Sequence, residues 1–180
     1  LKKSQEHRRY YKMGKILITF ILTIIGASLI TGCNSTGCLE NQNSVPLAGF
    51  YTSSTKKAIA IDSISIGGVG APSDSLIIDN GLGVSQVYLP FRSSKESTSF
   101  YIHYNQEALD FDALNDTITF DYESIPYFVS EECGAMYFYS IKKVEYTRHI
   151  IDSVGLLDSM VKNTDIERIR IYFRTSEPAE

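Results

Sequence analysis

The sequence predicts an all-β domain, most simply an antiparallel β-sandwich of about seven to nine short strands, with a small β-barrel as the alternative. Apolar residues in the body of the chain alternate with polar ones at a period of two rather than 3.6. Stretches rich in Gly, Pro, Asn and Asp separate the alternating segments. The chain has 12 Tyr and 9 Phe residues but no Trp, and aromatic residues favour strands.

Three stretches show the alternation most clearly, over residues 99–104, 117–122 and 168–174. In each stretch, large apolar side chains occupy every second position and polar side chains lie between them. A sheet that packs on the core with one face and is exposed to solvent on the other has this pattern. We therefore expect one buried row of side chains in each strand: Phe100, Ile102 and Tyr104, then Ile118, Phe120 and Tyr122, then Ile169, Ile171 and Phe173.

Two further stretches, residues 58–66 and 135–148, change the parity of their apolar side chains once along their length. In the second stretch, the change falls at Lys142-Lys143. A slip of one residue moves every following side chain to the other face of a sheet. Each change therefore predicts a β-bulge or a corner, as found where strands pass between two packed sheets.

The N-terminal segment has the features of a secretory signal peptide. Basic residues precede an uncharged, largely apolar run, Ile16–Gly32, of 17 residues, and the small pair Thr31-Gly32 comes directly before Cys33. This ending resembles the lipobox of bacterial lipoproteins, in which a diacylglyceryl group is attached to the cysteine before cleavage in front of it. A permanent transmembrane helix is the alternative, at the lower limit of the roughly 17–25 residues that span a bilayer. The small pair favours cleavage.

The expected layout follows from this leader. Residues 1–32 form the signal peptide, and we expect translation to begin at Met13, with residues 1–12 as an extension. Residues 33–46 form the lipidated N-terminus and a polar, flexible tether. Residues 47–176 form a single β-domain, and residues 177–180 form a short tail.

The charge of the mature chain argues against nucleic acid as a partner. Beyond residue 32 the chain carries 11 basic and 20 acidic side chains, a net charge of −9. No cluster of Lys and Arg interleaved with aromatic residues remains. An acidic body is not attracted to an anionic membrane surface, so membrane attachment is expected through the lipid on Cys33.

The cysteines other than Cys33 are two in number, which allows one disulfide. If Cys33 is lipidated, Cys38 and Cys133 are left, in an oxidising compartment that permits disulfides. A disulfide between them would close a loop of 95 positions, for which the chain-entropy model gives up to about 4.7 kcal/mol of stabilisation. We expect this disulfide, with two independent thiols as the alternative.

Three blocks of sequence carry a family resemblance: residues 87–90, 126–134 and 169–173. Together they resemble a family of small lipoproteins from Bacteroidota, a domain of unknown function, and the resemblance covers nearly all of the mature chain. It implies an envelope location and an all-β fold, and it implies no catalytic residue. Surface-displayed lipoproteins of this group often carry an acidic pair soon after the lipidated cysteine. Residues 34–40 lack one, which favours the periplasmic face of the outer membrane.

One set of polar residues comes nearest to a hydrolase triad. His149 lies close to Asp152 and Ser153 in the sequence. On a strand, His149 and Ser153 share a face while Asp152 points to the other, and no Gly-x-Ser-x-Gly elbow is present. We therefore interpret this stretch as an exposed polar segment, and His103 as a surface histidine on a wet face.

The acidic segment Asp110 to Asp116 invites a calcium site, because hard cations prefer clustered oxygen ligands. The EF-hand pattern requires an oxygen ligand at position 114 and Gly at position 115, where this chain has Leu114 and Asn115. A solvated acidic loop is the expectation, with no metal site and no cofactor.

Aromatic residues are dense between residues 120 and 146. Some of them must face outward if neighbours alternate, and an exposed aromatic patch binds proteins or sugars. The possible binding surface comprises Tyr122, Tyr127, Tyr137, Tyr139 and Tyr146. Core packing with tyrosines at the rim is the competing interpretation.

A basic row, Arg168, Arg170 and Arg174, lies on the expected C-terminal strand. Cross-strand pairing with acidic residues is its expected use. Guidance of an acidic ligand is the alternative.

The sequence therefore predicts a lipid-anchored, non-enzymatic protein of the cell envelope, facing the periplasm from the outer membrane. Its expected role is that of a protein-interaction or structural module, with an envelope protein or a glycan as the expected partner besides the membrane lipid. A small-ligand or glycan-binding lipoprotein, with a pocket lined by the tyrosines of residues 120–146, is the alternative. A hydrolase comes third.

Overall fold

The computed structural model describes residues 44–72, 75–131 and 133–175. This part of the chain has ten β-strands and, between β5 and β6, a turn of 3-10 helix, η2 (Asp112–Leu114), and no helix in it is long and apolar enough to cross a membrane. The strands are β1 (Leu47–Thr52), β2 (Ile64–Gly68), β3 (Leu76–Gly81), β4 (Gln86–Tyr88), β5 (Ser97–Tyr104), β6 (Asp116–Ser130), β7 (Gly134–Tyr146), β8 (Ile151–Leu156), β9 (Met160–Val161) and β10 (Glu167–Phe173). The predicted leader lies outside the described residues.

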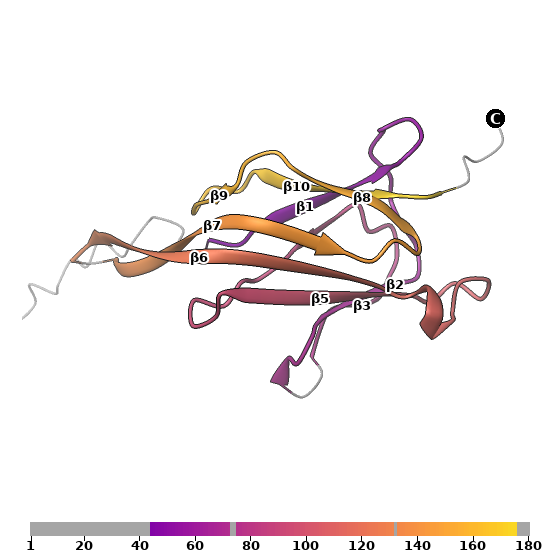
Figure 1. Cartoon of the computed structure of the whole chain (residues 1–180), viewed down its shortest axis with the longest axis horizontal. Coiled ribbons are helices and arrows are strands. Elements are labelled where there is room, and N and C mark those ends of the chain that lie inside the picture. Colours follow the sequence, from indigo (N-terminus) through magenta and orange to yellow (C-terminus); the bar gives the residue numbers. More distant parts are fainter. Residues whose placement is uncertain (1–43, 73–74, 132, 176–180) are drawn as a thin grey trace, which may run out of the picture. The chain divides into compact units, whose positions relative to one another are not determined.

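The strands form two sheets that face each other (Figure 1). One sheet has four strands in the order β4-β1-β10-β8, and the other has six in the order β3-β2-β5-β6-β7-β9. The six-stranded sheet is antiparallel throughout and curls into a half-barrel. The prediction of an all-β fold with two packed sheets is confirmed, and the curl gives it some of the character of the barrel alternative.

The four-stranded sheet departs from the antiparallel expectation at one place. β1 and β10 run parallel, with Phe50 opposite Ile171 and Thr52 opposite Phe173. Parallel neighbours need a long crossover connection, and here nearly the whole domain lies between the two strands. The first and last strands of the described chain therefore lie side by side at the centre of this sheet.

Both predicted changes of strand face are present. Residues 58–66 are a corner: Ala58 bridges to Tyr51 of the four-stranded sheet, whereas Ile64 begins β2 of the six-stranded sheet. Ser63, with a φ of 55°, lies at the bend. In β7, Asp121 opposes Lys143 and Tyr122 opposes Ile141, so Lys142 is the extra residue of a β-bulge.

The core fills the space between the two sheets. All nine side chains of the predicted buried rows are at most 3% exposed. Phe50 of β1 packs edge-on against Phe173 of β10, with ring centroids 5.2 Å apart. Phe91 stacks on Tyr122 of the six-stranded sheet at 4.4 Å and meets Tyr139 edge-on at 5.5 Å. Phe91, from the loop between β4 and β5, therefore closes the core above the middle of β6 and β7.

A buried carboxylate joins the two sheets at one end of the core. Asp116, the first residue of β6, is 0% exposed. Its Oδ2 accepts hydrogen bonds from the backbone N–H groups of Ile150 and Ile151, both at 2.8 Å, and its Oδ1 accepts from the N–H of His149 at 2.9 Å and the hydroxyl of Thr147 at 2.7 Å. These residues form the link from β7 to β8. Successive backbone N–H groups make a concave anion site, so Asp116 holds the crossover between the sheets.

Tyr104 of β5 completes the shell of donors around Asp116. Its hydroxyl donates to Oδ2 at 2.9 Å, and its side chain is 2% exposed. Burial, which disfavours the phenolate, raises the pKa of Tyr104 far above its ordinary value of 10, and the adjacent charge of Asp116 and the hydrogen bond act in the same direction. Tyr104 is therefore held as a neutral donor.

Removing this carboxylate is expected to destabilise the fold severely. The substitution Asp116→Ala should lower the free energy of unfolding by about 3–5 kcal/mol, because five donors lose their acceptor and those of Tyr104 and Ile151 are buried, where an unpaired donor costs about 1–3 kcal/mol. Asp121→Ala, at a half-exposed position of the same strand, is the matched control and should change it by less than about 0.5 kcal/mol. Urea unfolding followed by circular dichroism measures both. Equal losses from the two substitutions would contradict the assigned role.

The raised pKa of Tyr104 predicts a loss of stability in alkali. The unfolded chain releases the phenol proton near pH 10, whereas the folded chain retains it, so the stability that Tyr104 contributes is complete below pH 10 and falls as the pH rises towards the folded pKa. The free energy of unfolding should fall by up to about 1.4 kcal/mol per pH unit from this group. Urea titrations between pH 9 and pH 11 measure the slope, and Tyr104→Phe should make it shallower. The same slope in both proteins would show that Tyr104 titrates alike in the folded and unfolded chains.

Candidate functional site

β6 and β7 extend beyond the rest of their sheet as a two-stranded hairpin (Figure 1). β5 stops pairing with β6 at Asp121, and the short β9 pairs with β7 only at Tyr139 and Ser140. We call residues 124–138 of this hairpin the aromatic arm. Pro126 lies within it, where the side of β6 away from β7 has no neighbouring strand; such an edge tolerates a residue without an N–H group.

The turn of the aromatic arm is built by a bulge and a glycine. Phe128 pairs with Ala135 and Ser130 pairs with Gly134, which leaves Val129 as the extra residue. Gly134 has a φ of +72°, a left-handed conformation that glycine adopts without steric cost. Cys133 lies in this turn, and its backbone N–H donates to the hydroxyl of Ser130 at 3.1 Å. The predicted partner, Cys38, and the predicted lipid site, Cys33, lie outside the described residues.

One face of the arm continues the core-facing row of the sheet beyond the point where the core ends. On β6 the row runs from the buried Tyr122 to Pro126 and Phe128, and on β7 it runs from the buried Tyr139 back to Tyr137. Phe128 is 65% exposed and Tyr137 is 44% exposed. The same alternation that fills the core thus presents aromatic side chains to solvent where the four-stranded sheet, as far as the structure describes it, no longer covers them.

The other face of the arm is also aromatic. Tyr127 stacks on Phe138 of the paired strand, with ring centroids 4.5 Å apart and an angle of 21° between the planes. Tyr127 is nevertheless 45% exposed. Such cross-strand aromatic pairs stabilise a two-stranded ribbon that is marginal alone.

The five tyrosines of the predicted binding surface do not lie together. Tyr127 and Tyr137 lie on the arm and are exposed, but Tyr122 and Tyr139 are 3% and 7% exposed and belong to the core. The prediction is wrong for these two residues, because Phe91 packs over both rings. Tyr146 lies at the far end of β7, where the guanidinium of Arg148 approaches its ring. Phe128, absent from the predicted set, is the most exposed aromatic side chain of the arm; it shares the parity of Phe120 and Tyr122 along β6.

The polar residues that come nearest to a hydrolase triad in the sequence make structural contacts instead. The Nδ1 atom of His149 lies 2.7 Å from the backbone oxygen of Asn115 and 3.7 Å from Oδ1 of Asp116. Asp152 accepts a hydrogen bond from its neighbour Ser153 and pairs with Arg174 at 3.4 Å. His149 therefore does not join Asp152 and Ser153 in a triad.

The acidic side chains of residues 110–116, considered above as a calcium site, make separate contacts and do not converge on one point. Asp110 lies 3.2 Å from Nε2 of His103, whose Nδ1 lies 2.8 Å from Oδ1 of Asn115. Both carboxylate oxygens of Asp116 already accept the hydrogen bonds described above. Asp112 begins η2. Within the described residues no group of three or more His, Cys, Asp or Glu side chains has the arrangement of a metal site.

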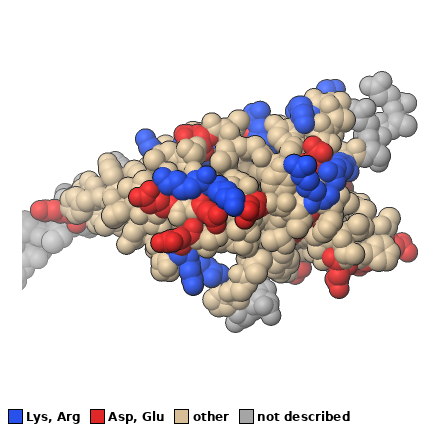
Figure 2. Space-filling model, viewed as in Figure 1, with Lys and Arg blue, Asp and Glu red and all other residues tan. Residues whose placement is uncertain are grey.

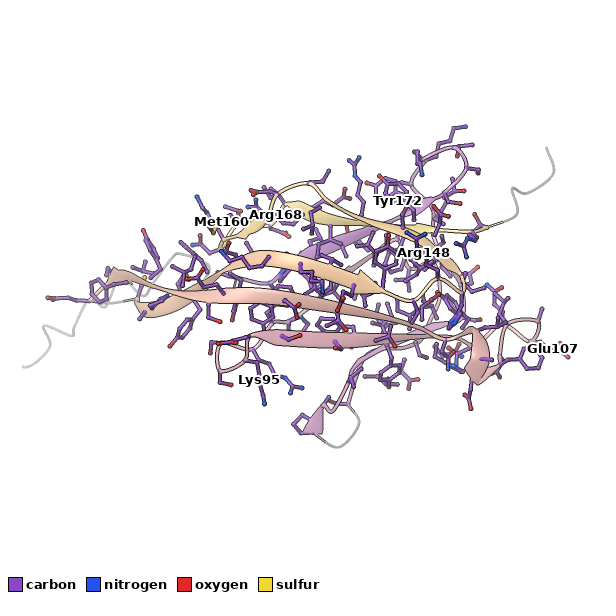
Figure 3. All side chains as sticks on the ribbon, viewed as in Figure 1. Lys95, Glu107, Arg148, Met160, Arg168 and Tyr172 are labelled. Carbon is purple, nitrogen blue, oxygen red and sulfur yellow. The ribbon has the colours of Figure 1, made fainter. Side chains whose placement is uncertain are left out.

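The basic row is used within the domain, with the expected cross-strand pairing at Arg174 and a pairing within β10 itself at Arg170. Arg170 pairs with Glu167 at 2.8 Å and Arg174 with Asp152 of the neighbouring β8. Arg168 was expected on a solvent-exposed face, but its side chain is 5% exposed and pairs with Asp158. Figure 3 shows its place in the domain. The hydroxyl of Tyr51 donates a bifurcated hydrogen bond to both carboxylate oxygens of Glu167, and this bond raises the pKa of Tyr51.

A groove of about 500 Å³ lies between the loop before β5 and the middle of β6. Its charged lining residues are Lys95, Glu96, Asp121, Glu123 and Lys142. Tyr122 is the aromatic residue among the described lining residues, and its hydroxyl is occupied by Thr98 at 2.7 Å and by the backbone of Arg92. Basic and acidic side chains are intermixed on this side of the domain (Figure 2). The groove therefore lacks the exposed aromatic platform of a sugar site.

The described residues thus form a two-sheet β-domain that presents an aromatic hairpin at one end. The chain belongs to a family of unknown function (DUF6452), whose model matches residues 61–173, more than half of the chain. The match runs from the corner before β2 to the end of β10, and it includes the whole aromatic arm. No curated protein and no solved structure matches the chain. The resemblance to a domain of unknown function is therefore confirmed at the level of the domain.

The aromatic rings of the arm are expected to contribute little to folding. Phe128→Ser should change the free energy of unfolding by less than about 0.5 kcal/mol, because the ring is exposed. Phe91→Ala, which removes a ring that contacts three core aromatics, should lower it by about 3–5 kcal/mol. Urea unfolding of the two variants gives the comparison. A comparable loss for Phe128→Ser would assign the arm a role in folding instead.

Proposed function

We propose that this protein is a lipid-anchored component of the cell envelope that acts by surface contact rather than by catalysis, as an interaction or structural module. The observation that carries the proposal is the aromatic arm. Phe128, Tyr127 and Tyr137 remain exposed at the end of a hairpin that projects from a well-packed domain. Exposed apolar side chains gathered at one end of a domain mark interaction sites.

The environment of the polar residues supports a role without catalysis. Asp116 and His149 are held in hydrogen bonds that shape the link between β7 and β8. Catalysis requires a nucleophile, a base and an orienting group that converge on one accessible point. The two histidines of the described part of the chain, His103 and His149, both contact Asn115 instead.

The lipid anchor rests on the leader. An uncharged, largely apolar run ends in Thr31-Gly32 before Cys33, and the mature chain has a net charge of −9, so electrostatic attraction to anionic lipid would not hold it at a membrane. We place the protein at the periplasmic face of the outer membrane, in a bacterium of the Bacteroidota, on the basis of the residues that follow Cys33 and the resemblance of the sequence blocks.

We also propose that Cys38 and Cys133 form a disulfide. Cys133 lies in the turn of the aromatic arm, so the bond would fasten the tether to the tip of the hairpin. A two-stranded ribbon gains from such a link, because it is marginally stable by itself.

A small-ligand or glycan-binding role is the alternative. It required a pocket lined by the tyrosines of residues 120–146. Tyr122 and Tyr139 are buried and Tyr146 lies far from the arm, so their positions favour a contact surface over a pocket.

The anchor is tested with Cys33→Ala. This substitution should abolish acylation and leave an uncleaved or mislocalised precursor, because the thiol that accepts the diacylglyceryl group is absent. Mass spectrometry of the intact protein and fractionation of envelopes measure the two effects, and Cys38→Ser is the matched control that should remain acylated. Wild-type protein without an acyl group on an N-terminal Cys33 would overturn the proposal.

A further inference from the structure

The aromatic arm has the composition of a surface that meets the interfacial layer of a lipid bilayer. Ser124–Ser130 and Gly134–Ile141 contain no charged side chain, and this end of the domain is mostly uncharged surface in Figure 2. Its exposed rings are those of Phe128, Tyr127 and Tyr137. Aromatic side chains, with an apolar body and for tyrosine a polar tip, concentrate at the level of the lipid headgroups.

The length of chain between the predicted lipid and the arm determines which end of the domain approaches the membrane. Cys38 follows Cys33 by five residues, which reach at most about 18 Å when extended. A disulfide to Cys133 adds a Cα separation of about 6 Å. The turn of the arm would then lie within about 24 Å of the lipid attachment point.

The opposite end of the domain cannot lie as close to the lipid attachment point as the arm does while the disulfide holds the arm there. β6 has 15 residues, a length of about 50 Å at about 3.3 Å per residue. The loop before η2, which contains Glu107, lies at the far end of this strand (Figure 3). Phe111, in the same loop, is 59% exposed.

We propose that the aromatic arm lies in the interfacial layer of the membrane that holds the acyl chains of Cys33, and that the disulfide between Cys38 and Cys133 keeps it there. The inference rests on the proposed function, since it requires an acylated Cys33. Phe128 and Tyr137 provide the apolar contact, and the domain stands with its η2 end away from the bilayer. The arm thus orients the domain relative to the membrane.

The charges near the tip set the depth of the arm and its lipid preference. Glu131 lies in the turn two residues before Cys133, and the sequence has a second carboxylate, Glu132, between them. A carboxylate does not enter the hydrocarbon layer without a large cost. The contact is therefore shallow, at the headgroups. Anionic lipids repel the acidic domain, so contact is stronger on zwitterionic phosphatidylethanolamine than on phosphatidylglycerol.

The absence of Trp from the chain allows a direct test. Full-length lipidated protein carrying Phe128→Trp is reconstituted into phosphatidylethanolamine vesicles with and without a lipid brominated high on its acyl chains, and Phe111→Trp is the matched control of similar exposure. Brominated lipid should quench the fluorescence of the Phe128→Trp protein and leave that of the Phe111→Trp protein unchanged. Increasing the fraction of phosphatidylglycerol should weaken the quenching.

The outcomes separate this inference from the proposed function. Absence of quenching in a protein whose mass shows the acyl group overturns the membrane contact and leaves the lipid anchor intact, whereas a missing acyl group overturns the anchor itself. Equal quenching at both positions overturns the proposed orientation. A photo-crosslinker at position 128 that captures a protein instead of lipid in intact envelopes also overturns it.

The disulfide is tested with Cys38→Ser and Cys133→Ser in the Phe128→Trp background. Both substitutions should reduce quenching while acylation persists, and the Cys38→Ser substitution does so without altering the hairpin. Undiminished quenching in both variants, or alkylation of Cys38 and Cys133 in the native protein without reductant, would overturn the part of the inference that assigns the disulfide this role.

Discussion

The arrangement of the two sheets depends on the hydrogen bonds that converge on Asp116. A buried carboxylate is tolerated only where donors replace the water it has lost. Here three consecutive backbone N–H groups and the hydroxyls of Thr147 and Tyr104 do so. Because the N–H groups belong to the link between β7 and β8, the same contacts direct the chain from the six-stranded sheet to the four-stranded sheet. The rest of the core is mostly apolar and less directional, with the hydrogen bond between Thr98 and the hydroxyl of Tyr122 as a second buried polar contact.

The opposite end of β6 and β7 has a different physical character. The two strands continue past their neighbours, and their inward-facing row passes from the buried Tyr122 and Tyr139 to the exposed Phe128 and Tyr137. One end of the hairpin is therefore fixed by a polar cluster, while the other presents uncovered aromatic rings. The exposed rings at the arm end support the proposal that the domain acts by surface contact through that end, rather than by enclosing a ligand.

Much of the secondary structure could be predicted from alternation alone. The rows of β5, β6 and β10 are buried as expected, and the parity changes mark a corner before β2 and a bulge at Lys142. The parallel pairing of β1 with β10 was not predictable, because no local pattern encodes the neighbour of a strand so distant in sequence. Arg168 was placed on a solvent-exposed face for a similar reason: its burial depends on Asp158 and Thr164, which the segments before and after β9 bring to it.

The sequence by itself determined the signal-like leader that precedes Cys33, the all-β character of the chain and the apolar face of each strand that alternates clearly. These features depend on local composition and on a period of two. Only the tertiary structure decided which of those apolar faces are covered. Tyr139 and Tyr137 have the same parity on one strand, yet one is core and the other is exposed, because Phe91 covers the first and no strand among the described residues extends over the second.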